Sequence, residues 1–438
     1  MARSLVTRSL AVLGVTSLAV AGSASPLYAG SGSAATMGGP VTAFASWGSS
    51  EKTDFMAILK YCDANYHTKS TYQQSSGDYN TELNTRIRGG NPPDVGFIST
   101  PSTLAQYVAG NAIQPLTFLN QKQLATDYSS FWLNASKVNG KIYALYMKAD
   151  NKSLVWYSPK KLTAGHYQVP KTWNDLVALS QKMVKDGKQP WAFGTNNSGW
   201  TITDFLENVY LQSAGPQMYQ KWINHQIKWT DPSMVKAFQT MNQIIGNNSF
   251  IAGGRAHALG QAFDQAAKQM VVDPKVELYQ EASFIGAILR GDLPQAVEGV
   301  DYNSFPFPRI GSTSGPTPVE VGPNAAIMLK DTPGARALMS CLADPKALAQ
   351  WAKLGGFLSP NSAVPMSAYP DALTRKEAQM ITDAGKAGQL VSDASDSMLP
   401  AIGSDYEFIA LQKYFQNPSS YMSILSDLES HAAKAYGH

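Results

Sequence analysis

The stretch PVTAFASW at residues 40–47 predicts a short buried strand that ends before Gly48. A helix follows, capped by Asp54, because four apolar residues recur at i, i+3, i+4 and i+7 and share one face: Phe55, Ile58, Leu59 and Cys62. Two more strand–helix pairs continue the pattern, with strands at 71–74 and 94–98 and helices at 80–88 and 102–109. Strands that alternate with helices indicate an α/β fold with a parallel sheet.

The regular alternation stops near Lys141. Two extended segments follow, at 142–147 and 153–157, and they flank the polar patch KADN at 148–151.

The second half of the chain is predominantly helical in its pattern. Thr172 and Asp175 have the spacing of a capping box at the start of one helix, and more helices are expected over about 201–300. An apolar strand is predicted at 325–329, followed by a helix over 333–354. Two successive glycines end that helix, which is the usual chemistry of a helix stop.

Length and composition limit the classes of protein that fit. A chain of 438 residues exceeds one compact core of the usual size, so two lobes or domains are expected. Hydrophobic residues make up 44% and charged residues 15%, as in globular proteins. The formal net charge is +3, and loss of Arg3 and Arg8 with a leader leaves +1. A chain so close to neutral, without a Lys/Arg stripe, gives no basis for nucleic-acid binding.

Residues 1–29 have the features of an export signal. Arg3 and Arg8 give a basic start, the run at 10–21 is apolar but too short to span a bilayer, and Ala29 closes a small-residue cleavage site. A buried N-terminal helix is the alternative interpretation. Residues 30–39 then predict a flexible linker. We expect an exported protein, located in the periplasm or on the outer face of the cytoplasmic membrane.

Cys62 and Cys341 are the only cysteines in the sequence. An oxidising compartment permits a disulfide between them, whereas their helix-like surroundings are also typical of buried free thiols. Both interpretations stay open at this level. A single pair excludes CxxC redox chemistry and cysteine-rich metal sites.

Nine short motifs occur in order along the chain: GGNPPDV (89–95), AIQPL (112–116), GKIYAL (140–145), LVWYSPKKL (154–162), PKTWNDL (170–176), SGWTITDFLE (198–207), YQEASF (279–284), FPFP (305–308) and GGFLSPN (355–361). Together they resemble the extracellular sugar-binding proteins of ABC importers, most closely the branch associated with α-glucosides and other oligosaccharides. No single motif is diagnostic. The resemblance covers nearly all of the chain from Val41 onward, and the order of the motifs makes it specific.

The resemblance implies a two-lobe, periplasmic-binding-protein-like fold of type II, with three chain crossings and a ligand cleft at the hinge. By position, lobe one comprises 40–148 and 322–357, and lobe two comprises 150–320 and 360–438. The implied function is capture of a carbohydrate by hinge closure and its delivery to the permease subunits of an ABC importer. We expect a monomer that needs no cofactor.

The leader departs from the pattern of many Gram-positive relatives. Those proteins carry a lipobox cysteine after the signal, whereas Ser23 occupies the comparable place in LAVAGS at 18–23. Lipid anchoring is therefore not expected from this sequence.

A sugar site needs two kinds of side chain. A pyranose has apolar C–H faces that stack on aromatic rings, and a rim of hydroxyls that pair with carboxylates and amides. Eleven residues are candidates for contact with the sugar: Trp47, Asp78, Ser99, Thr100, Asp150, Trp200, Asp204, Gln280, Phe284, Gly356 and Phe357. Among them Trp200 is the preferred stacking platform, because it follows Gly199 at the start of a helix.

Each candidate in the first half of the chain also has a structural interpretation. Trp47 follows the first strand, at the end where α/β sheets bind ligands, and its position fits a core role equally well. Ser99 and Thr100 follow the third strand and are equally suited to capping the next helix. Asp78 fits an acidic position of the resembling branch or an ordinary solvated turn. Asp150 pairs with a sugar hydroxyl or with a neighbouring lysine, Lys148 or Lys152.

The later candidates divide in the same way. Asp204 either shares the cleft or complements the dipole in the first turns of its helix. Gln280 and Phe284 are four residues apart, which places them on one face of a predicted helix. Gly356 and Phe357 offer backbone N–H groups to a ligand, or belong to a plain helix C-cap.

Other functions remain as alternatives. An exported glycoside hydrolase needs two carboxylates at a fixed separation, which sequence cannot measure. The chain has no GxSxG, HExxH or Walker A segment, and its six histidines show no metal-ligand spacing, so we expect no enzyme and no metal. A non-sugar solute such as a polyamine, peptide or anion, or a surface module without transport, is compatible with the same architecture.

Overall fold

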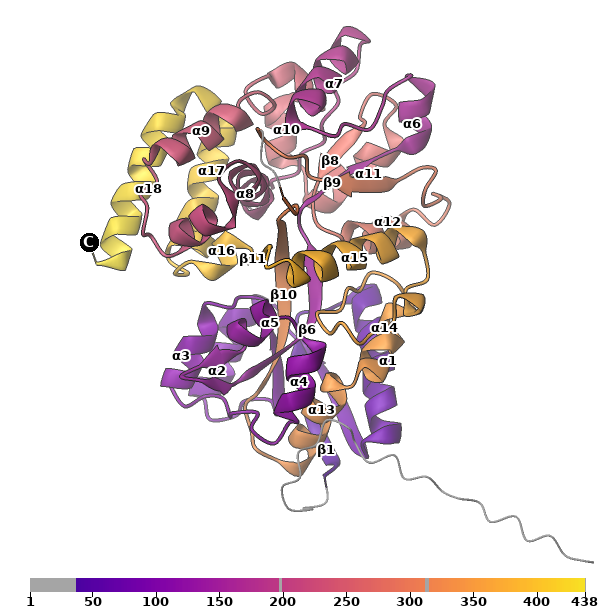
Figure 1. The fold of residues 1–438 in the computed structure, drawn as a ribbon, viewed down its shortest axis with the longest axis vertical. Helices are drawn as coiled ribbons and strands as arrows, with labels where there is room; N and C mark the ends of the chain where they lie inside the picture. The colour runs from indigo at the N-terminus through magenta and orange to yellow at the C-terminus, as the bar shows by residue number, and fades with distance from the viewer. Residues whose placement is uncertain (1–36, 197–198, 312–314, 438) are drawn as a thin grey trace, which may run out of the picture.

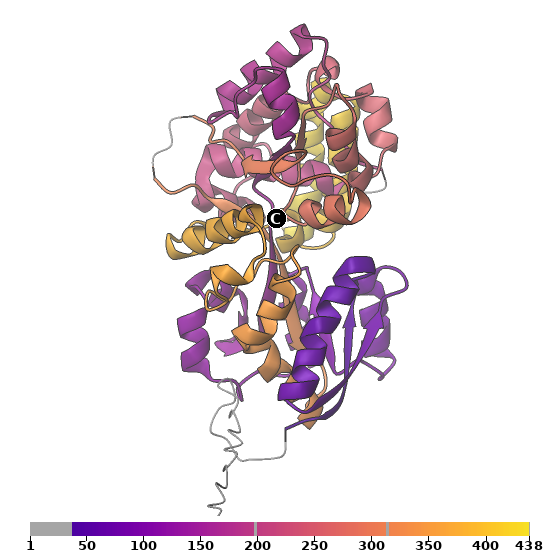
Figure 2. The same ribbon diagram turned by 90° about the vertical axis from the view of Figure 1, so that its right-hand side faces the viewer.

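The chain forms two lobes that are stacked along the long axis of the molecule (Figure 1). The computed structural model describes residues 37–196, 199–311 and 315–437. The predicted signal and most of the predicted linker lie outside these ranges. One large cluster of buried apolar residues forms the core of lobe one, and two further clusters fill lobe two. A narrow waist joins the lobes and is visible from both directions (Figures 1 and 2).

Lobe one is built on a six-stranded sheet: β1 (Gly39–Ala45), β2 (Thr68–Gln74), β3 (Val95–Ile98), β6 (Ala144–Asn151), β10 (Val319–Met328) and β11 (Leu390–Ser392). β1 pairs in parallel with β2 and β3, which confirms the predicted parallel α/β core. β10 runs antiparallel to both β3 and β6, so the complete sheet is mixed.

The helices of lobe one cover this sheet: α1 (Ser49–Asn65), α2 (Tyr79–Arg88), α3 (Thr103–Ala109), α4 (Gln121–Asp127), α5 (Ser130–Ala135), α13 (Pro333–Ala343) and α14 (Pro345–Ala352). A small hairpin, β4 (Lys137–Val138) and β5 (Lys141–Ile142), precedes β6. The prediction of one helix over 333–354 is wrong. Pro345 disfavours helical geometry at Asp344, whose φ of −75° and ψ of 119° end α13 and begin α14.

A disulfide joins Cys62 of α1 to Cys341 of α13, with Cα atoms 5.6 Å apart. The bridge decides between the two interpretations of this pair that the sequence left open. Both side chains are fully buried in the core of lobe one. The bond therefore ties together two parts of the lobe that are 279 residues apart in the chain.

Lobe two is mostly helical around a three-stranded antiparallel sheet, β7 (Leu154–Tyr157), β8 (Leu278–Gln280) and β9 (Asn303–Pro306). Its helices are α6 (Pro159–Ala164), α7 (Trp173–Lys185), α8 (Trp200–Ile223), α9 (Pro232–Met241), α10 (Gly254–Gly260), α11 (Phe263–Val272), α12 (Ile285–Asp292), α16 (Ala394–Ser397), α17 (Glu407–Gln416) and α18 (Tyr421–Tyr436). Single turns complete it: η1 (Asn248–Phe250), η3 (Ile402–Tyr406) and η4 (Pro418–Ser420).

Two helices of lobe two show how local sequence sets their bounds. Thr172 Oγ1 accepts a hydrogen bond from the Asp175 N–H at 3.2 Å, and the Asp175 carboxylate accepts one from the Thr172 N–H at 3.0 Å. The predicted capping box at the start of α7 is thus confirmed. α8 bends at Gly215, where φ is +81°, just before Pro216, which has no N–H to continue the helical ladder.

The chain passes between the lobes three times. β6 continues into β7 after a two-residue link, so the polar patch at 148–151 is part of a strand and does not interrupt it. β10 returns to lobe one beside β6, as Figure 1 shows. The last passage leads through η2 (Met366–Ala368), α15 (Ala372–Lys386) and β11 to α16.

Helix α15 lies at the waist and contacts both lobes. Ala378, Ile381 and Ala384 pack into the core of lobe one. On the other side, Glu377 accepts a hydrogen bond at 2.9 Å from Ser304 Oγ of β9 in lobe two. The exact division of the chain between the lobes stays a prediction.

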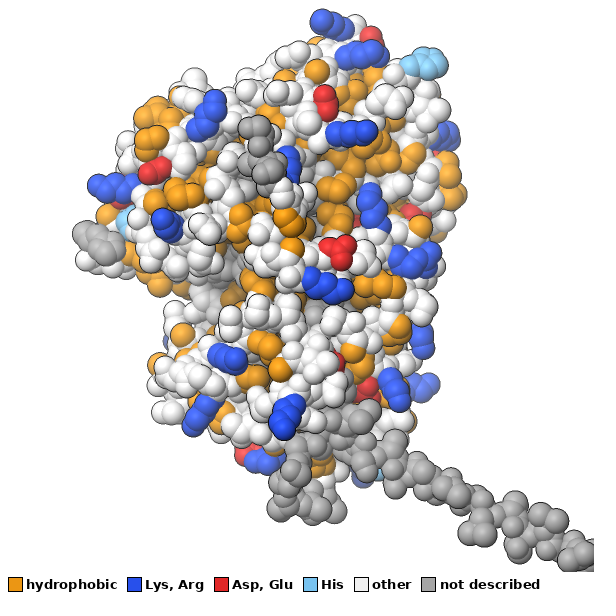
Figure 3. Space-filling model, viewed as in Figure 1, with side chains coloured by type: hydrophobic (Ala, Val, Ile, Leu, Met, Phe, Trp, Pro, Cys, Tyr) orange, Lys and Arg blue, Asp and Glu red, His pale blue; other side chains and the backbone are white. Residues whose placement is uncertain are grey.

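No described helix has both the length and the apolar character that crossing a membrane requires. On the face drawn in Figure 3, basic and acidic side chains are scattered over both lobes without forming a basic stripe.

Candidate functional site

A cleft of about 510 Å³ lies between the lobes at the waist. The first part of lobe one contributes six lining residues that follow β1 and β3 or begin α1: Ser46, Trp47, Gly48, Ser50, Glu51 and Ser99. The strands of the waist contribute six more: Lys148, Asp150, Lys152, Gly322, Pro323 and Asn324. Lobe two contributes Phe263, Phe284, Ala287, Ile288 and Asp396. The cleft thus lies at the carboxyl ends of parallel strands, where α/β proteins bind ligands.

Lys148 is the centre of the charges on the lobe-one side of the cleft. Its Nζ lies 2.8 and 2.7 Å from the two carboxylate oxygens of Asp150 and 3.5 Å from Glu51 Oε1. Burial alone would lower the pKa of Lys148, but the two carboxylates hold it above its ordinary value. Burial raises the pKa of Glu51, against the opposing effect of Lys148. Asn324 Nδ2 adds a 3.5 Å contact to Asp150 Oδ2.

A register shift in the β6–β10 pair orients these side chains. Asn324 pairs with Lys148 and Ala325 pairs with Tyr146, so Met147 is the extra residue of a bulge. The alternation of side chains between the two faces of β6 is interrupted at Met147. As a result Lys148 lines the cleft, whereas the Tyr146 ring packs 5.2 Å from the ring of Trp132.

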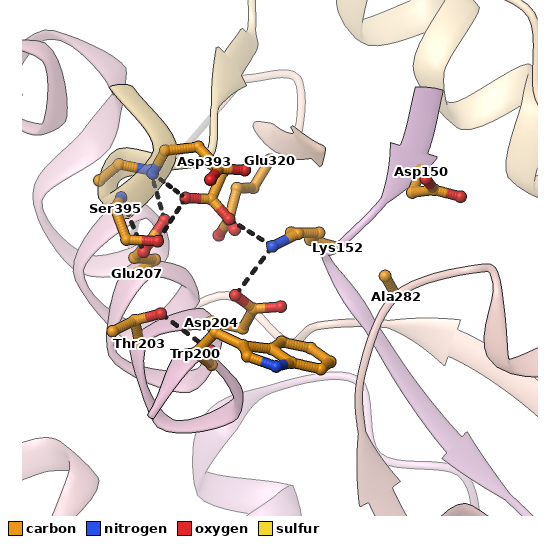
Figure 4. Close-up of polar contacts among 12 residues, drawn as sticks. Asp150, Lys152, Trp200, Thr203, Asp204, Glu207, Ala282, Glu320, Asp393 and Ser395 are labelled. Carbon is orange, nitrogen blue, oxygen red and sulfur yellow. Dashed lines mark hydrogen bonds and ion pairs between the residues drawn. The ribbon is translucent and has the colours of Figure 1, made fainter. Parts of the chain in front are cut away.

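Lys152 is the second buried lysine of the waist, and it points into lobe two (Figure 4). Its Nζ lies 3.0 Å from Asp204 Oδ1 and also pairs closely with Asp393 Oδ2. Burial disfavours the charged amine, yet the two carboxylates hold the pKa of Lys152 well above its ordinary value. Burial raises the pKa of Asp204 to about 7, while the neighbouring ammonium holds that of Asp393 low despite its burial.

More carboxyl groups surround this pair than one lysine can neutralise. Burial and the neighbouring acids raise the pKa of Glu207, Glu320 and Asp396 well above the usual range. Glu207 accepts hydrogen bonds from Tyr219 Oη at 2.7 Å and from backbone N–H groups at the start of α16. Burial thus opposes ionisation of these three acids, and hydrogen bonds to Glu207 act in the other direction.

Three of the acids have a spacing that suits a metal ion. Asp204, Glu207 and Asp393 each present a carboxylate oxygen, and these atoms lie within 4.8 Å of one another. The Lys152 ammonium pairs with two of the three. The protein's own cation thus supplies the positive charge at this position.

Three aromatic rings form a wall on the lobe-two side of the cleft. The Trp200 ring lies 5.0 Å from that of Phe263 and 6.1 Å from that of Phe284, and the last two are 6.0 Å apart. Lys152 Nζ lies 5.8 Å from the centre of the Trp200 ring. Phe263 and Phe284 line the cleft, while Trp200 supports them and is itself only half buried.

Four of the eleven predicted site residues line the cleft: Trp47, Ser99, Asp150 and Phe284. Trp47 has the predicted core role, since it is only 5% exposed and its ring packs 4.9 Å from that of Phe55 and 5.0 Å from that of Phe97, and it also borders the cleft. Asp150 likewise pairs with Lys148 and borders the cleft. Whether these residues contact a sugar stays a prediction.

The other candidates lie elsewhere. Asp78 is exposed and caps α2, accepting a hydrogen bond from the Thr81 N–H at 2.8 Å. The Thr100 carbonyl accepts from Thr103 at the start of α3. The prediction that Gln280 and Phe284 share a helical face is wrong, because Gln280 ends strand β8 and Phe284 caps α12.

Gly356 and Phe357 border a small internal cavity next to the cleft. Gly356 has φ of +66°, and a Cβ there would lie 2.6 Å from Ala287 Cβ, so glycine permits a close approach to α12. The Phe357 ring is fully buried and packs 5.1 Å from that of Trp351. Gly356 therefore permits a close contact between the lobes, whereas Phe357 belongs to the core of lobe one.

Sequence reasoning missed several residues of this site. Glu51 escaped because the helix was predicted to be capped by Asp54. That prediction is wrong, since α1 begins at Ser49 after Gly48 and Asp54 lies within the helix. Glu207 and Asn208 follow Asp204 by three and four residues, which places three polar groups on one face of the buried helix α8. That spacing was a readable signal. Phe263 and Asn324 carry no local signal that separates them from core or turn residues.

The sequence matches the family model of the bacterial extracellular solute-binding protein over residues 48–349. It is 33% identical to the osmoprotective compounds-binding protein GgtB of Synechocystis sp. over 74% of this chain and 76% of that protein. It is 30% identical to the alpha-glucosides-binding periplasmic protein AglE of Rhizobium meliloti, over 84% of this chain and 81% of that one.

Solved structures share the architecture. The bacterial solute receptor AcbH superposes with a TM-score of 0.78 at 19% identity, covering 91% of this chain and 99% of that chain. The protein RafE, in complex with raffinose, gives a TM-score of 0.71 at 15% identity, covering 90% and 99%. At such identities the likeness concerns the fold, and it confirms the predicted two-lobe arrangement of type II.

Proposed function

The chain belongs to the bacterial extracellular solute-binding protein family, and we propose on this premise that it captures a carbohydrate for an ABC importer. The observation that carries the proposal is the construction of the cleft. Its lobe-one side and the strands of the waist present polar groups: the carboxylates of Glu51 and Asp150, the amines of Lys148 and Lys152, and the amide of Asn324. Its lobe-two side presents the aromatic rings of Phe263 and Phe284.

These two kinds of wall match the two kinds of surface on a sugar. The apolar C–H face of a pyranose stacks on rings such as those of Phe263 and Phe284, with Trp200 behind them. Its hydroxyls donate to the carboxylates of Glu51 and Asp150 and accept from the lysine between them. No metal or cofactor is needed for such recognition.

Closure follows from the positions of the two walls. A ligand in contact with only one lobe gains only half of the available interactions. When the lobes rotate about the waist, the same ligand touches Glu51 in lobe one and Phe284 in lobe two, and this differential affinity stabilises the closed state. The closed, loaded form is the one that an importer's permease subunits receive.

The sugar is proposed to be an α-glucoside or another small oligosaccharide. This finer assignment is supported by the relative from Rhizobium meliloti, which is named for α-glucosides, and by the overall match to it. The protein is proposed to act as a monomer outside the cytoplasmic membrane, in the periplasm or at the membrane's outer face. No catalytic step is part of the proposal.

A thermal-shift panel on the mature chain tests the proposal. The ligands are maltose, trehalose, sucrose, palatinose, cellobiose and xylobiose, beside amino acids, spermidine and phosphate. A ligand that binds the folded state alone raises the melting temperature by mass action. We expect one sugar to raise the melting temperature by several degrees. In Trp200→Ala, the same rise should need a sugar concentration at least ten times higher.

Tyr421→Ala is the matched control, since Tyr421 is another half-buried aromatic residue of lobe two and packs against Phe238, far from the cleft residues. It should lower stability without changing the sugar concentration needed for the shift. A response to spermidine, an amino acid or phosphate in place of every sugar would overturn the carbohydrate assignment. Hydrolysis of a sugar during incubation would favour an enzyme.

A further inference from the structure

A second pocket lies on the other side of β6 from the cleft. It has a volume of about 320 Å³, and Trp132 lines it. The ring of Trp132 packs on Tyr146, whereas Lys148, beyond the bulge in the same strand, lines the cleft. The pocket is bounded by α4, α5 and α15, and Figure 1 shows α5 next to α15 on the viewer's side of the waist.

The lining of this pocket is rich in hydroxyl groups. Six serine and threonine side chains contribute: Thr126, Ser129, Ser130, Ser359, Ser362 and Thr382. Two aromatic residues, Tyr128 and Trp132, are 5% and 2% exposed and complete the wall. Lys386 is the one charged residue among those that line it. Hydroxyls beside aromatic faces, without a carboxylate, suit a neutral polyhydroxy compound better than an ion.

Several of these hydroxyls have unused hydrogen-bonding capacity. Ser129 Oγ is buried and has no hydrogen-bond partner. Ser362 Oγ donates to the Asp127 carbonyl at 2.8 Å, and Thr382 Oγ1 donates to the Ala378 carbonyl at 3.0 Å. The lone pairs of the last two oxygens thus stay available to accept from a ligand.

We propose that this pocket is a second binding site, which takes a small neutral polyol and works independently of the cleft. A volume of about 320 Å³ is near the lower end of known ligand sites, about 300–1,000 Å³. The ligand is therefore of the size of a pentitol or a single sugar unit. Ser359 and Ser362 belong to the segment that follows α14 toward the waist, so the ligand contacts both this segment and α15.

An NMR titration of the mature protein with xylitol tests the proposal. The signal observed is the Trp132 indole N–H, assigned by its absence in Trp132→Phe. We expect a saturable shift of this signal that persists in Lys148→Met, because Lys148 lines the cleft and not the second pocket. In Thr382→Phe the new ring fills the pocket, and the affinity for xylitol should fall at least tenfold.

Gln379→Phe is the matched control, because Gln379 is exposed on the same helix and does not line the pocket. It should leave the titration unchanged. If Thr382→Phe does not fold, Ser130→Leu at the exposed rim replaces it. Absence of a saturable shift overturns the proposal, and so does a shift that Lys148→Met abolishes while Thr382→Phe preserves it.

Discussion

At the scale of single residues, the site depends on two buried lysines that each organise carboxylates. Lys148 holds Glu51 and Asp150 at the edge of the cleft, and Lys152 holds Asp204 and Asp393 just behind it. Both lysines belong to the short segment that joins the lobes. Positive charge at the waist therefore fixes the acids of both lobes relative to the cleft.

Replacement of Lys148 tests this organising role. Without the ammonium, two neighbouring carboxylates lose their shared partner and no longer present oxygens in fixed positions to sugar hydroxyls. We expect Lys148→Met to weaken sugar binding at least tenfold, a loss of about 1.4 kcal/mol, in isothermal titration calorimetry. Lys160→Met, at a lysine that is 72% exposed, is the control and should bind normally. Equal affinities for Lys148→Met and the unaltered protein would refute this role.

Glu377 predicts a pH dependence of stability. Burial raises its pKa from the usual 4.5 to about 8, so between these values the folded state holds one proton more than the unfolded state. The stabilisation is complete below about pH 4.5 and is lost as the pH rises through about 8, with a slope of up to about 1.4 kcal/mol per pH unit.

Glu377→Gln should remove this part of the slope, because a glutamine does not titrate and still accepts the hydrogen bond from Ser304. The measurement is denaturant unfolding at a series of pH values, with Asp383→Asn, at an exposed acid of the same helix, as the control. Parallel pH profiles for Glu377→Gln and the unaltered chain would show that the carboxyl is not held protonated.

At the scale of elements, the disulfide between α1 and α13 has a predicted effect on stability. Both cysteines lie in the core of lobe one, away from the residues of the cleft, but the 279-residue separation that they bridge includes much of lobe two. We expect the double variant Cys62→Ser, Cys341→Ser to lose about 2–5 kcal/mol in free energy of unfolding while it retains sugar affinity. Denaturant titration measures the free energy of unfolding, and calorimetry measures the sugar affinity. A double variant as stable as the oxidised protein would contradict the expected loss of stability.

The elements that the sequence predicted well are those that depend on neighbours in the chain. Alternation over residues 40–109 and the capping box at Thr172 are local, and both are present in the structure. The break at Asp344 was also local, since an Asp-Pro pair disfavours a continuous helix. The antiparallel pairing of β6 with β10 was not predictable from periodicity, because its register depends on residues about 175 positions apart.

The contrast between local and long-range features also explains which residues of the candidate site could be predicted. Trp47, Ser99 and Asp150 were found because they follow strands or occupy an extended polar segment. The acids around Lys152 come from α8, β10 and the start of α16, and only the folded chain brings them together (Figure 4). Gln280 was misplaced because a three-residue strand in a mostly helical region leaves too short a pattern to detect.

At the scale of the whole molecule, the two lobes enclose the cleft in which we propose that a carbohydrate binds. The waist consists of β6, β10 and the segment that includes α15. Residues of β6 and β10 line the cleft, and residues of all three elements pack into the core of lobe one. Rotation about such a waist moves the aromatic wall of α11 and α12 relative to Glu51 in α1. In the proposed mechanism, closure adds the contacts of the second lobe to those that the ligand already makes with the first.

Small-angle X-ray scattering of the mature chain during titration with the stabilising sugar tests this central claim most directly. We predict that the radius of gyration falls in a saturable way, with the same midpoint that calorimetry gives for binding, and that Trp200→Ala moves both midpoints together. Saturable sugar binding with unchanged scattering would contradict capture by closure, and compaction that occurs only with a non-sugar solute would contradict the carbohydrate.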